Sequence, residues 1–154
     1  MSIEVGSVAP WVTSYCEDGT KIELSELRGQ NVVLYFYPKD DTPGCTIEAQ
    51  DFTKYLPELE KLKTIILGVS KDSKASHCKF IEKYNIGFNL IADEDKKLCE
   101  TYEVLKEKSM FGKKYQGIER STFLIDDNGN IIKIWRNVKV KNHAEEVIKT
   151  IKIT

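Results

Sequence analysis

Short runs of apolar residues alternate with segments of helical periodicity along the first half of the chain. Residues 32–37 and 64–69 are continuous runs rich in β-branched and aromatic side chains, which indicates strands buried on both faces of a sheet. Between them, apolar residues recur at helical spacing over residues 43–63. Pro57 interrupts that pattern, so we expect a first helix to about Lys54, then a kink and a shorter second helix.

The alternation continues after the second apolar run. Asp72 or Ser73 is a suitable N-cap for a helix that ends near Asn85, and residues 88–91 predict a short strand. The segment 93–102 begins with three acidic residues, which are favourable at the positive end of a helix dipole, and it predicts a further helix.

Turn residues between apolar segments predict two hairpins. Residues 12–15 and 21–24 flank an Asp-Gly pair near the start of the chain. Residues 121–125 and 131–135 flank Asp-Asn-Gly-Asn, which is a strong hairpin signal. We therefore expect one hairpin at the N-terminus and a second one late in the chain.

An irregular segment and a closing helix complete the pattern. Residues 104–119 carry apolar residues among lysines and two glycines without a clear period, so we expect a long functional loop over the surface, or a simple spacer. Asn142 and Glu145 form a capping box before a last helix that has one apolar face.

This order of elements indicates one α/β domain over residues 1–154. Alternating strands and helices, followed by a hairpin and a closing helix, predict a central mixed β-sheet with helices on both faces, preceded by an N-terminal β-hairpin. The order resembles the thioredoxin-like fold. That resemblance places Cys45 where such folds keep a reactive thiol, at the junction of the first core strand and its helix.

Composition and charge narrow the classes of function. The 154 residues are 41% hydrophobic and 31% charged, which is ordinary for a globular protein, and the net charge is −1. That balance gives no global electrostatic reason to expect binding to nucleic acid. We find no basic segment followed by an apolar stretch at the N-terminus and no run of membrane-spanning length, so we expect a cytoplasmic protein without a membrane partner.

Four cysteines are widely spaced, at Cys16, Cys45, Cys78 and Cys99. They form no C-x-x-C pair and none of the closely spaced pairs of a structural zinc site, so we expect neither a metal nor another cofactor. Without an export signal, we expect reduced cysteines, most of them buried as small apolar residues.

Cys45 differs from the other cysteines in its local setting. Thr42 is a suitable N-cap and Pro43 a suitable first helical residue, so Cys45 falls in the first turn of a helix. Unpaired backbone N–H groups and the positive end of the helix dipole favour the thiolate there. The dipole contributes only ~0.3 to 1 kcal/mol, so full activation of the thiol requires a further cation, such as an arginine from elsewhere in the chain.

The sequence around this cysteine resembles the active-site signature of the peroxiredoxins. Pro38, Thr42 and Cys45 have the spacing of that signature within YFYPKDDTPGCTIEAQDF. The resemblance is to the bacterioferritin comigratory protein, or peroxiredoxin Q, group. It extends over nearly the whole chain, including Arg120 with the Ser-Thr-Phe that follows it. It implies a thiol-dependent peroxidase that reduces hydrogen peroxide and organic hydroperoxides in antioxidant defence.

The resemblance implies a role for each matching residue. Cys45 is the peroxidatic cysteine, whose thiolate attacks one oxygen of the hydroperoxide and becomes a sulfenic acid. Arg120 supplies the cation and Thr42 a hydroxyl, and such donors stabilise charge on the departing oxygen. Glu48 resembles the carboxylate that holds the arginine, although an ordinary solvated helix carboxylate is the alternative. Pro38 shields the sulfur.

The sequence departs from this group at the resolving cysteine. Members often carry it five positions after the peroxidatic one, where this chain has Gln50. A second subset places it on the helix after the second core strand. Cys78 lies on that helix, one turn from Ile81, which is nearer to the usual place. We expect Cys78 to resolve by a disulfide that requires the first turn after Cys45 to unwind, with thioredoxin or a similar thiol as reductant.

Alternatives to this resolving role remain open. The main one is an enzyme without an internal resolving cysteine, and Cys99 and Cys16 are weaker candidates than Cys78. In a purely structural role, Cys78 would occupy the apolar face of its helix beside Phe80 and Ile81. We expect a monomer, with a small dimer as the alternative.

Two histidines and two further functions complete the hypotheses. His77 and His143 lie near helix starts, where a capping or surface role is more ordinary than general-base catalysis. A general thiol–disulfide oxidoreductase would suit the fold, but the chain lacks the C-x-x-C pair of such enzymes. A non-enzymatic redox sensor or holdase is motivated by Met110, Phe111 and Tyr115 in the irregular segment.

Overall fold

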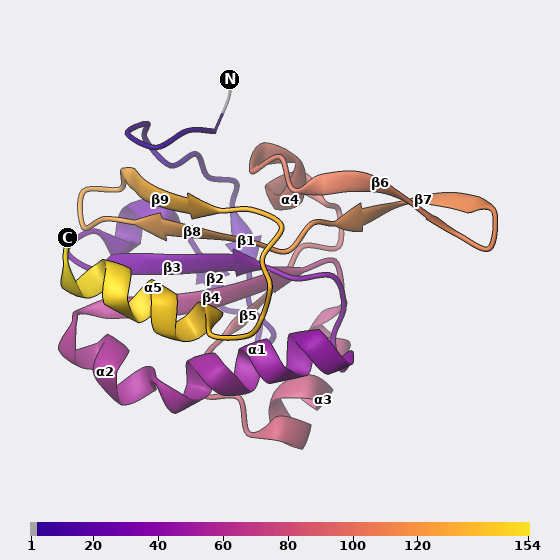
Figure 1. Cartoon of the computed structure of the whole chain (residues 1–154), viewed down its shortest axis with the longest axis horizontal. Coiled ribbons are helices and arrows are strands. Elements are labelled where there is room, and N and C mark those ends of the chain that lie inside the picture. Colours follow the sequence, from indigo (N-terminus) through magenta and orange to yellow (C-terminus); the bar gives the residue numbers. More distant parts are fainter. Residues whose placement is uncertain (1–2) are drawn as a thin grey trace.

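The computed structural model describes residues 3–154, which form a five-stranded sheet with helices on both faces (Figure 1). In sheet order, the strands are β5 (Leu90–Ala92), β4 (Thr64–Ser70), β3 (Asn31–Phe36), β8 (Ser121–Ile125) and β9 (Ile131–Trp135). β3, β4 and β5 are parallel, whereas β8 pairs antiparallel with β3 and with β9. The sheet is therefore mixed, as the sequence predicts.

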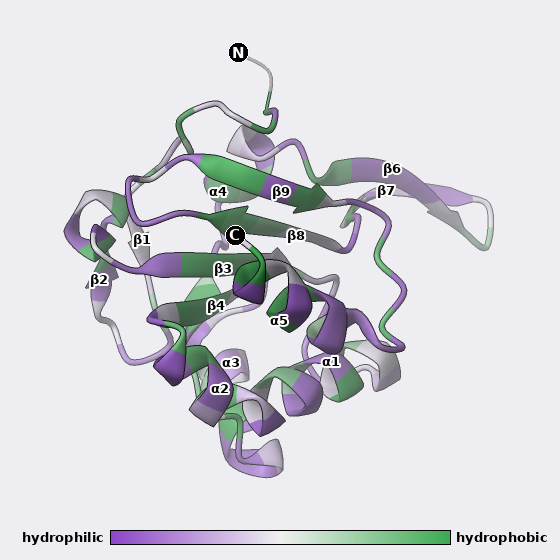
Figure 2. Ribbon diagram, turned by 60° about the vertical axis from the view of Figure 1, so that its left-hand side comes forward, coloured by the Kyte–Doolittle hydropathy of each residue, from purple (hydrophilic) through white to green (hydrophobic). Residues whose placement is uncertain are grey.

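Two apolar cores cover the two faces of this sheet. Along β3, Val33 and Tyr35 pack in one core and Val32 and Leu34 in the other, because successive side chains of a strand point to opposite faces. The helices of the first core are α1 (Pro43–Lys54), α2 (Leu56–Lys61), α3 (Lys74–Tyr84) and α5 (His143–Lys152). The second core contains residues of α4 (Lys97–Thr101), β2 (Lys21–Ile22) and the 3-10 helix η1 (Leu24–Leu27). β1 (Ser14–Tyr15) pairs with β2. Figure 2 shows hydrophobic residues gathered along the central strands, which the two cores cover on both faces.

The long helical pattern after β3 is divided at Pro57, as predicted. α1 ends at Lys54 and α2 begins at Leu56, with Tyr55 between them. Pro57 lies in the first turn of α2, where its missing N–H costs no helical hydrogen bond. The hairpin of β8 and β9 has the predicted bounds, and the N-terminal hairpin is present in a shorter form, as β1 and β2.

Polar residues before α3 and α4 bind free N–H groups at the starts of these helices. Ser73 is the N-cap of α3, and its hydroxyl accepts a hydrogen bond from the Ser76 N–H at 3.1 Å, which confirms the predicted cap. The Asp93 carboxylate accepts hydrogen bonds from the N–H groups of Leu98 and Cys99 at 3.1 and 2.8 Å. Asp93 lies outside α4, so this helix is shorter than predicted.

The segment 104–119 is a β-hairpin, so the prediction of an irregular loop is wrong. β6 (Leu105–Met110) and β7 (Lys113–Ile118) pair antiparallel and extend away from the rest of the molecule (Figure 1). Most of their side chains are exposed, so the apolar alternation that identifies a strand is missing. Phe111 and Gly112 form the turn at positive φ angles of 52° and 78°. Phenylalanine is rare at such a position, so the sequence gives no hairpin signal there.

The predicted capping box at the last helix is also wrong. Asn142 precedes α5 in a left-handed conformation, with φ 62° and ψ 8°, and its side chain makes no capping hydrogen bond. A capping box needs an extended backbone at that residue. The apolar face of α5 is confirmed, because the residues predicted to form it are all buried, namely Ala144, Val147, Ile148 and Ile151.

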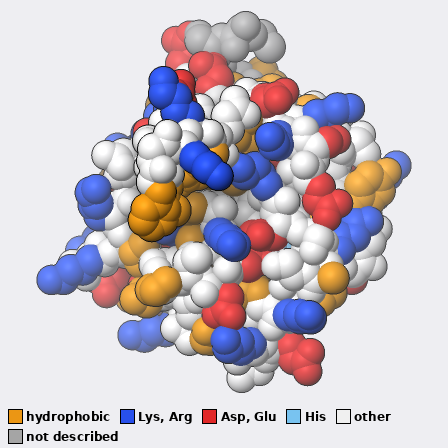
Figure 3. Space-filling model, turned by 90° about the vertical axis from the view of Figure 1, so that its right-hand side faces the viewer, with side chains coloured by type: hydrophobic (Ala, Val, Ile, Leu, Met, Phe, Trp, Pro, Cys, Tyr) orange, Lys and Arg blue, Asp and Glu red, His pale blue; other side chains and the backbone are white. Residues whose placement is uncertain are grey.

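Charges of both signs are mixed on the end of the molecule from which the β6–β7 hairpin extends. Figure 3 shows Lys and Arg side chains interspersed there with Asp and Glu side chains, and smaller groups of hydrophobic side chains between them. Across residues 3–154, we find no helix with the length and apolar character needed to cross a membrane.

Candidate active site

Cys45 lies in the first turn of α1, as predicted, directly after the loop that leaves β3. α1 begins at Pro43, and the Thr46 N–H donates to the Thr42 carbonyl at 2.9 Å, which closes this first turn. The Cys45 side chain is buried, with 1% of the residue exposed. The thiol is therefore held at the positive end of the helix and away from bulk water.

The loop between β3 and α1 contains two further candidates, Pro38 and Thr42. Pro38 is half-buried in the bend that follows β3. Thr42 is the N-cap residue with an extended backbone, but its side chain makes no capping bond, contrary to the prediction. Its hydroxyl donates instead to the Lys39 carbonyl at 2.8 Å, an acceptor within the same loop. The hydroxyl hydrogen is thus already engaged, whereas the oxygen keeps lone pairs as acceptors.

Arg120 is brought to Cys45 by the pairing of β8 with β3. It lies immediately before β8, and its Nη2 donates to Cys45 Sγ at 3.4 Å. Its Nη1 donates to Glu48 Oε1 at 2.7 Å. Cys45 and Glu48 are three residues apart on α1 and so share one face of the helix. The structure thus joins the predicted cysteine, arginine and carboxylate in one cluster, and it excludes a solvated position for Glu48, which is 2% exposed.

Gly44 has no side chain, and this leaves room for the Arg120 guanidinium. A Cβ atom on Gly44 would lie 3.2 Å from Arg120 Nη2 and 3.9 Å from Val140 Cγ2. The first of these distances is tighter than most real Cβ contacts, so any larger residue would displace the arginine. Sequence reasoning did not single out Gly44, because its role depends on a contact with a residue distant in the chain.

Burial and charge act against each other in the pair of Glu48 and Arg120. Burial raises the pKa of Glu48 to about 7, although Arg120 acts to lower it. Burial also opposes the charge on Arg120, but Glu48 and Cys45 outweigh it and raise the pKa of the guanidinium. Among the described residues, Glu48 Oε2 has no hydrogen-bond partner. Arg120 is therefore a permanent cation beside the sulfur, whereas Glu48 becomes neutral as the pH falls below about 7.

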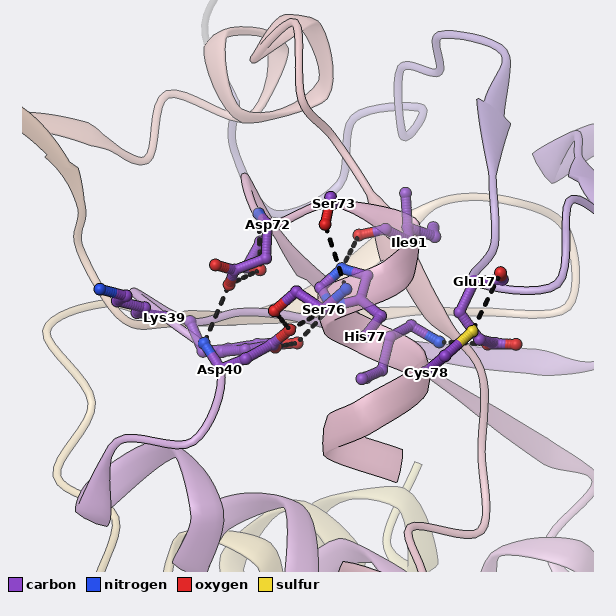
Figure 4. A network of polar contacts seen from close by, with 12 residues as sticks. Glu17, Lys39, Asp40, Asp72, Ser73, Ser76, His77, Cys78 and Ile91 are labelled. Carbon is purple, nitrogen blue, oxygen red and sulfur yellow. Dashed lines mark hydrogen bonds and ion pairs between the residues drawn. The ribbon is translucent and has the colours of Figure 1, made fainter. Parts of the chain in front are cut away.

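The other cysteines differ sharply in exposure. Cys78 is exposed on α3, and its thiol donates to the Glu17 carbonyl at 3.4 Å (Figure 4). The structure therefore excludes the alternative in which Cys78 is a core residue on the apolar face of its helix. Cys16 and Cys99 are buried, and burial raises the pKa of both thiols, to about 12 for Cys16. Both are therefore poor candidates for thiolate chemistry.

Both histidines are buried, so the surface or capping roles expected for them are wrong. Their helix starts pack against the sheet, which turns these positions inward. His143 Nε2 lies 2.8 Å from Thr122 Oγ1, and burial lowers the pKa of His143 to about 4. His77 Nδ1 lies 2.7 Å from Asp40 Oδ2 (Figure 4).

One group of potential metal ligands occurs within residues 3–154. Ligand atoms of Asp40, Asp72 and His77 lie within 4.8 Å of one another. These atoms are already engaged in hydrogen bonds. Asp40 binds His77, and Asp72 Oδ2 accepts hydrogen bonds from the Asp40 N–H at 2.9 Å and the Ser70 hydroxyl at 2.6 Å. We therefore interpret the group as a hydrogen-bond network.

Known proteins are similar to this chain over most of its length. Residues 5–134 match the AhpC/TSA family. The chain is 51% identical over 148 residues to a putative peroxiredoxin Bcp of Coxiella burnetii, which covers 96% of this chain and 98% of that protein. It is 50% identical over 152 residues to peroxiredoxin Bcp of Bacillus subtilis, which covers 99% of this chain and 97% of that protein.

Solved structures share the fold. A cysteine-to-serine mutant of Xylella fastidiosa PrxQ has a TM-score of 0.94 at 40% identity and covers 99% of this chain and 98% of its own. The bacterioferritin comigratory protein of Xanthomonas campestris, described for its alkyl peroxide reduction activity, has a TM-score of 0.88 at 45% identity and covers 92% of this chain and 90% of its own. The chain therefore belongs to the AhpC/TSA family and is a peroxiredoxin of the Bcp/PrxQ group with a thioredoxin-like fold.

Proposed function

We propose that this peroxiredoxin reduces hydrogen peroxide and organic hydroperoxides, with Cys45 as its peroxidatic cysteine. The observation that carries the proposal is the position of the Arg120 guanidinium, which binds Cys45 Sγ at 3.4 Å and Glu48 Oε1 at 2.7 Å. A cation and the start of α1 both stabilise negative charge on this buried sulfur. The thiolate is the form that attacks peroxides.

The proposed reaction is a displacement at the peroxide bond. The Cys45 thiolate attacks the terminal oxygen of ROOH, and an S–O bond forms as the O–O bond breaks. The sulfur is oxidised to sulfenic acid, and the peroxide is reduced to RO⁻, which takes up a proton and leaves as water or an alcohol. Arg120 N–H groups stabilise the charge that moves from sulfur to the departing oxygen, as preorganised donors do in other active sites.

The loop before Cys45 orients the peroxide in this proposal. Because the Thr42 hydroxyl donates to the Lys39 carbonyl, its oxygen accepts a hydrogen bond from the O–H of the peroxide. Pro38, half-buried at the start of the loop, keeps water away from the sulfur. Each of these contacts favours a peroxide whose terminal oxygen points at the thiolate.

We also propose that Cys78 resolves the sulfenic acid. Its thiol attacks the Cys45 sulfur, which releases water and forms a disulfide, and thioredoxin or a similar dithiol then reduces this disulfide. A disulfide needs Cα atoms within ~7 Å, so the buried Cys45 must leave its position through unwinding of the first turn of α1. The exposure of Cys78 leaves its thiol accessible to that sulfur and to a reductant.

Both thiols of this cycle belong to one chain, so we propose that the protein works as a monomer. The proposed cycle needs a reduced thiol at Cys45 and a thiol reductant, and the cytoplasm supplies both conditions, so we propose that location.

The test measures peroxide consumption with thioredoxin and its reductase. We expect Cys45→Ser to abolish it and Cys99→Ala, a change at a buried thiol outside the site, to leave it near the wild-type rate. Near-normal activity of Cys45→Ser would overturn the proposal.

After one equivalent of hydrogen peroxide, peptide mass spectrometry should find a Cys45–Cys78 disulfide. Persistent sulfenic acid in the wild type, with normal recycling of Cys78→Ser, would instead show that Cys78 does not resolve.

The same proteins test the two alternative functions. Insulin reduction without peroxide would indicate a general thiol–disulfide oxidoreductase. The β6–β7 hairpin exposes Met110, Phe111 and Tyr115, which is the feature that favours a holdase. Slow peroxide consumption that is unaffected by Cys45→Ser, together with oxidation-dependent suppression of aggregation, would support that role instead.

A further inference from the structure

A buried hydrogen-bond network joins the loop before Cys45 to helix α3 (Figure 4). Asp40 is at its centre. Its Oδ2 lies 2.7 Å from His77 Nδ1 and accepts the Ser76 hydroxyl at 2.8 Å, while its Oδ1 accepts the Tyr37 hydroxyl at 2.6 Å. Asp40 and His77 are 7% and 0% exposed. A loop residue is therefore fixed to a neighbouring helix through a carboxylate shielded from water.

The partners of the His77 ring define its protonation. Nε2 lies 2.9 Å from the Ile91 carbonyl, which can only accept a hydrogen bond, so Nε2 must carry a proton. Nδ1 faces the Asp40 carboxylate, which also accepts. The imidazolium is the form that donates to both. Burial opposes this charge, but the hydrogen bond and charge of Asp40 prevail and raise the pKa of His77 above its ordinary value.

Asp40 also fixes the main chain of the loop. Its N–H donates to Asp72 Oδ2 at 2.9 Å, so both its backbone and its side chain are held by the β4–α3 region. The next residue, Asp41, has a positive φ of 58°, a conformation that aspartate tolerates better than most residues. Thr42 and then α1 follow directly. The position of the catalytic turn thus depends on contacts at Asp40.

We propose that Asp40 and His77 are positioning residues that hold the loop 38–42, and with it the first turn of α1, in the conformation in which Cys45 reacts with peroxide. The inference rests on the proposed peroxidase mechanism and extends it, because the pair acts through the loop. Release of the pair loosens the loop, displaces Cys45 from Arg120 and slows the attack on peroxide.

The pair depends on pH because His77 must be protonated. The titratable groups that face His77 are Asp40 and Tyr37 from the β3–α1 segment and Asp72 from the β4–α3 loop. Burial keeps the pKa of Tyr37 well above its ordinary value, so this hydroxyl stays neutral. Since the pKa of His77 is raised on folding, its stabilising contribution is complete below the unfolded value of about 6.5 and is lost as the pH rises through the folded pKa.

The first test measures the rate constant for oxidation of Cys45 by hydrogen peroxide in a single turnover, from about pH 6 to about pH 10. We expect the wild-type rate to fall as the pH rises through the pKa of His77. His77→Gln and Asp40→Asn should each react about tenfold more slowly at about pH 6, since small misplacements of reacting groups are costly, and should lose this fall. The double variant should be no slower than either single variant, because both changes break the same pair.

The matched control is Lys83→Met. Lys83 Nζ binds Asp41 Oδ2 at 2.8 Å and also joins the loop to α3, but the two side chains are 59% and 43% exposed. Exposed ion pairs contribute little, so this variant should keep the wild-type rate and pH profile. Wild-type behaviour of His77→Gln, including the fall in rate with rising pH, would overturn the proposal.

Hydrogen exchange supplies a readout that needs no peroxide. Backbone amides of residues 39–42 and 44–45 should exchange faster in His77→Gln than in the wild type or in Lys83→Met. If the wild type shows no Cys45-dependent peroxide consumption, the proposed function fails, and exchange alone then decides whether the pair holds the loop. If His77→Gln does not fold, NMR titration of the wild-type ring replaces it. A His77 pKa at or below its ordinary value of about 6.5 would contradict the ion pair.

Discussion

Arg120 Nη2 donates a hydrogen bond to Cys45 Sγ at 3.4 Å although 75 positions separate the two residues in the chain. The contact exists because β8 pairs with β3, the strand whose end leads into α1. The same guanidinium binds Glu48 one turn further along α1. A single arginine thus connects the Cys45 sulfur, the helix that carries it and the neighbouring strand.

Replacement of this arginine should strongly slow the reaction with peroxide. We expect Arg120→Ala to reduce the rate constant about 10²- to 10³-fold, the effect of losing a preorganised donor in an active site. Arg120→Lys should recover little, because an ammonium group lacks the planar fork that binds sulfur and carboxylate together. Arg136→Ala is the control, since Arg136 donates to the carbonyls of Glu103 and Tyr102 and lies over the Phe123 ring. An Arg120→Ala enzyme of near-normal activity would contradict the mechanism.

Gly44→Ala should change activity and stability in opposite directions. The added Cβ would lie 3.2 Å from Arg120 Nη2, so the guanidinium must shift slightly. We expect this shift to weaken its hydrogen bond to Cys45 Sγ and to lower the rate with peroxide. Alanine is a better helix former than glycine by up to ~1 kcal/mol, so the free energy of unfolding should stay the same or rise. Stopped-flow kinetics and urea unfolding measure the two effects. An equal loss of both would mean that the substitution simply damages the fold.

Glu48→Gln should differ from the wild type in a pH-dependent way. The pKa of Glu48 is raised to about 7 by burial, so the wild-type side chain is neutral in acid, like glutamine, and charged in alkali. The rate constant for Cys45 oxidation in the wild type, divided by that in Glu48→Gln, should therefore be close to one below pH 7. This ratio should increase above pH 7, because the ionised carboxylate holds Arg120. Taking the ratio cancels the titration of groups that the two proteins share. A ratio independent of pH would show that Glu48 keeps one protonation state.

His143 should make the fold less stable in acid. Burial lowers its pKa from 6.5 to about 4, so the unfolded chain binds the proton more readily between these values. Its contribution to stability is present above pH 6.5 and is lost as the pH falls towards 4. Between pH 8 and pH 5 this loss is on the order of 2 kcal/mol. His143→Gln should reduce the pH dependence of urea unfolding by that amount. If the free energy of unfolding changed equally between the two pH values in the wild type and in His143→Gln, the lowered pKa of His143 would be refuted.

The sequence by itself determined the local features of the protein. The buried strand before Cys45, the start of α1 at Pro43 and the division of the helix at Pro57 follow from side-chain pattern and backbone geometry within a few residues. The motif of Pro38, Thr42 and Cys45 indicated the family. Such features are readable because their causes lie close together in the chain.

Contacts between distant segments determined the arrangement of the candidate site, the β6–β7 hairpin and the pair of Asp40 and His77. The pairing of β3 with β8 places Arg120 at the sulfur and gives Gly44 its role. The β6–β7 hairpin was not predicted from the sequence, because its side chains are mostly exposed and follow no apolar period. Backbone pairing between the two strands forms it. Asp40 and His77 lie 37 positions apart, and only burial against each other makes them an ion pair. Neighbours supplied by folding set hydrogen bonding, charge and exposure, so these properties could not be read from the chain alone.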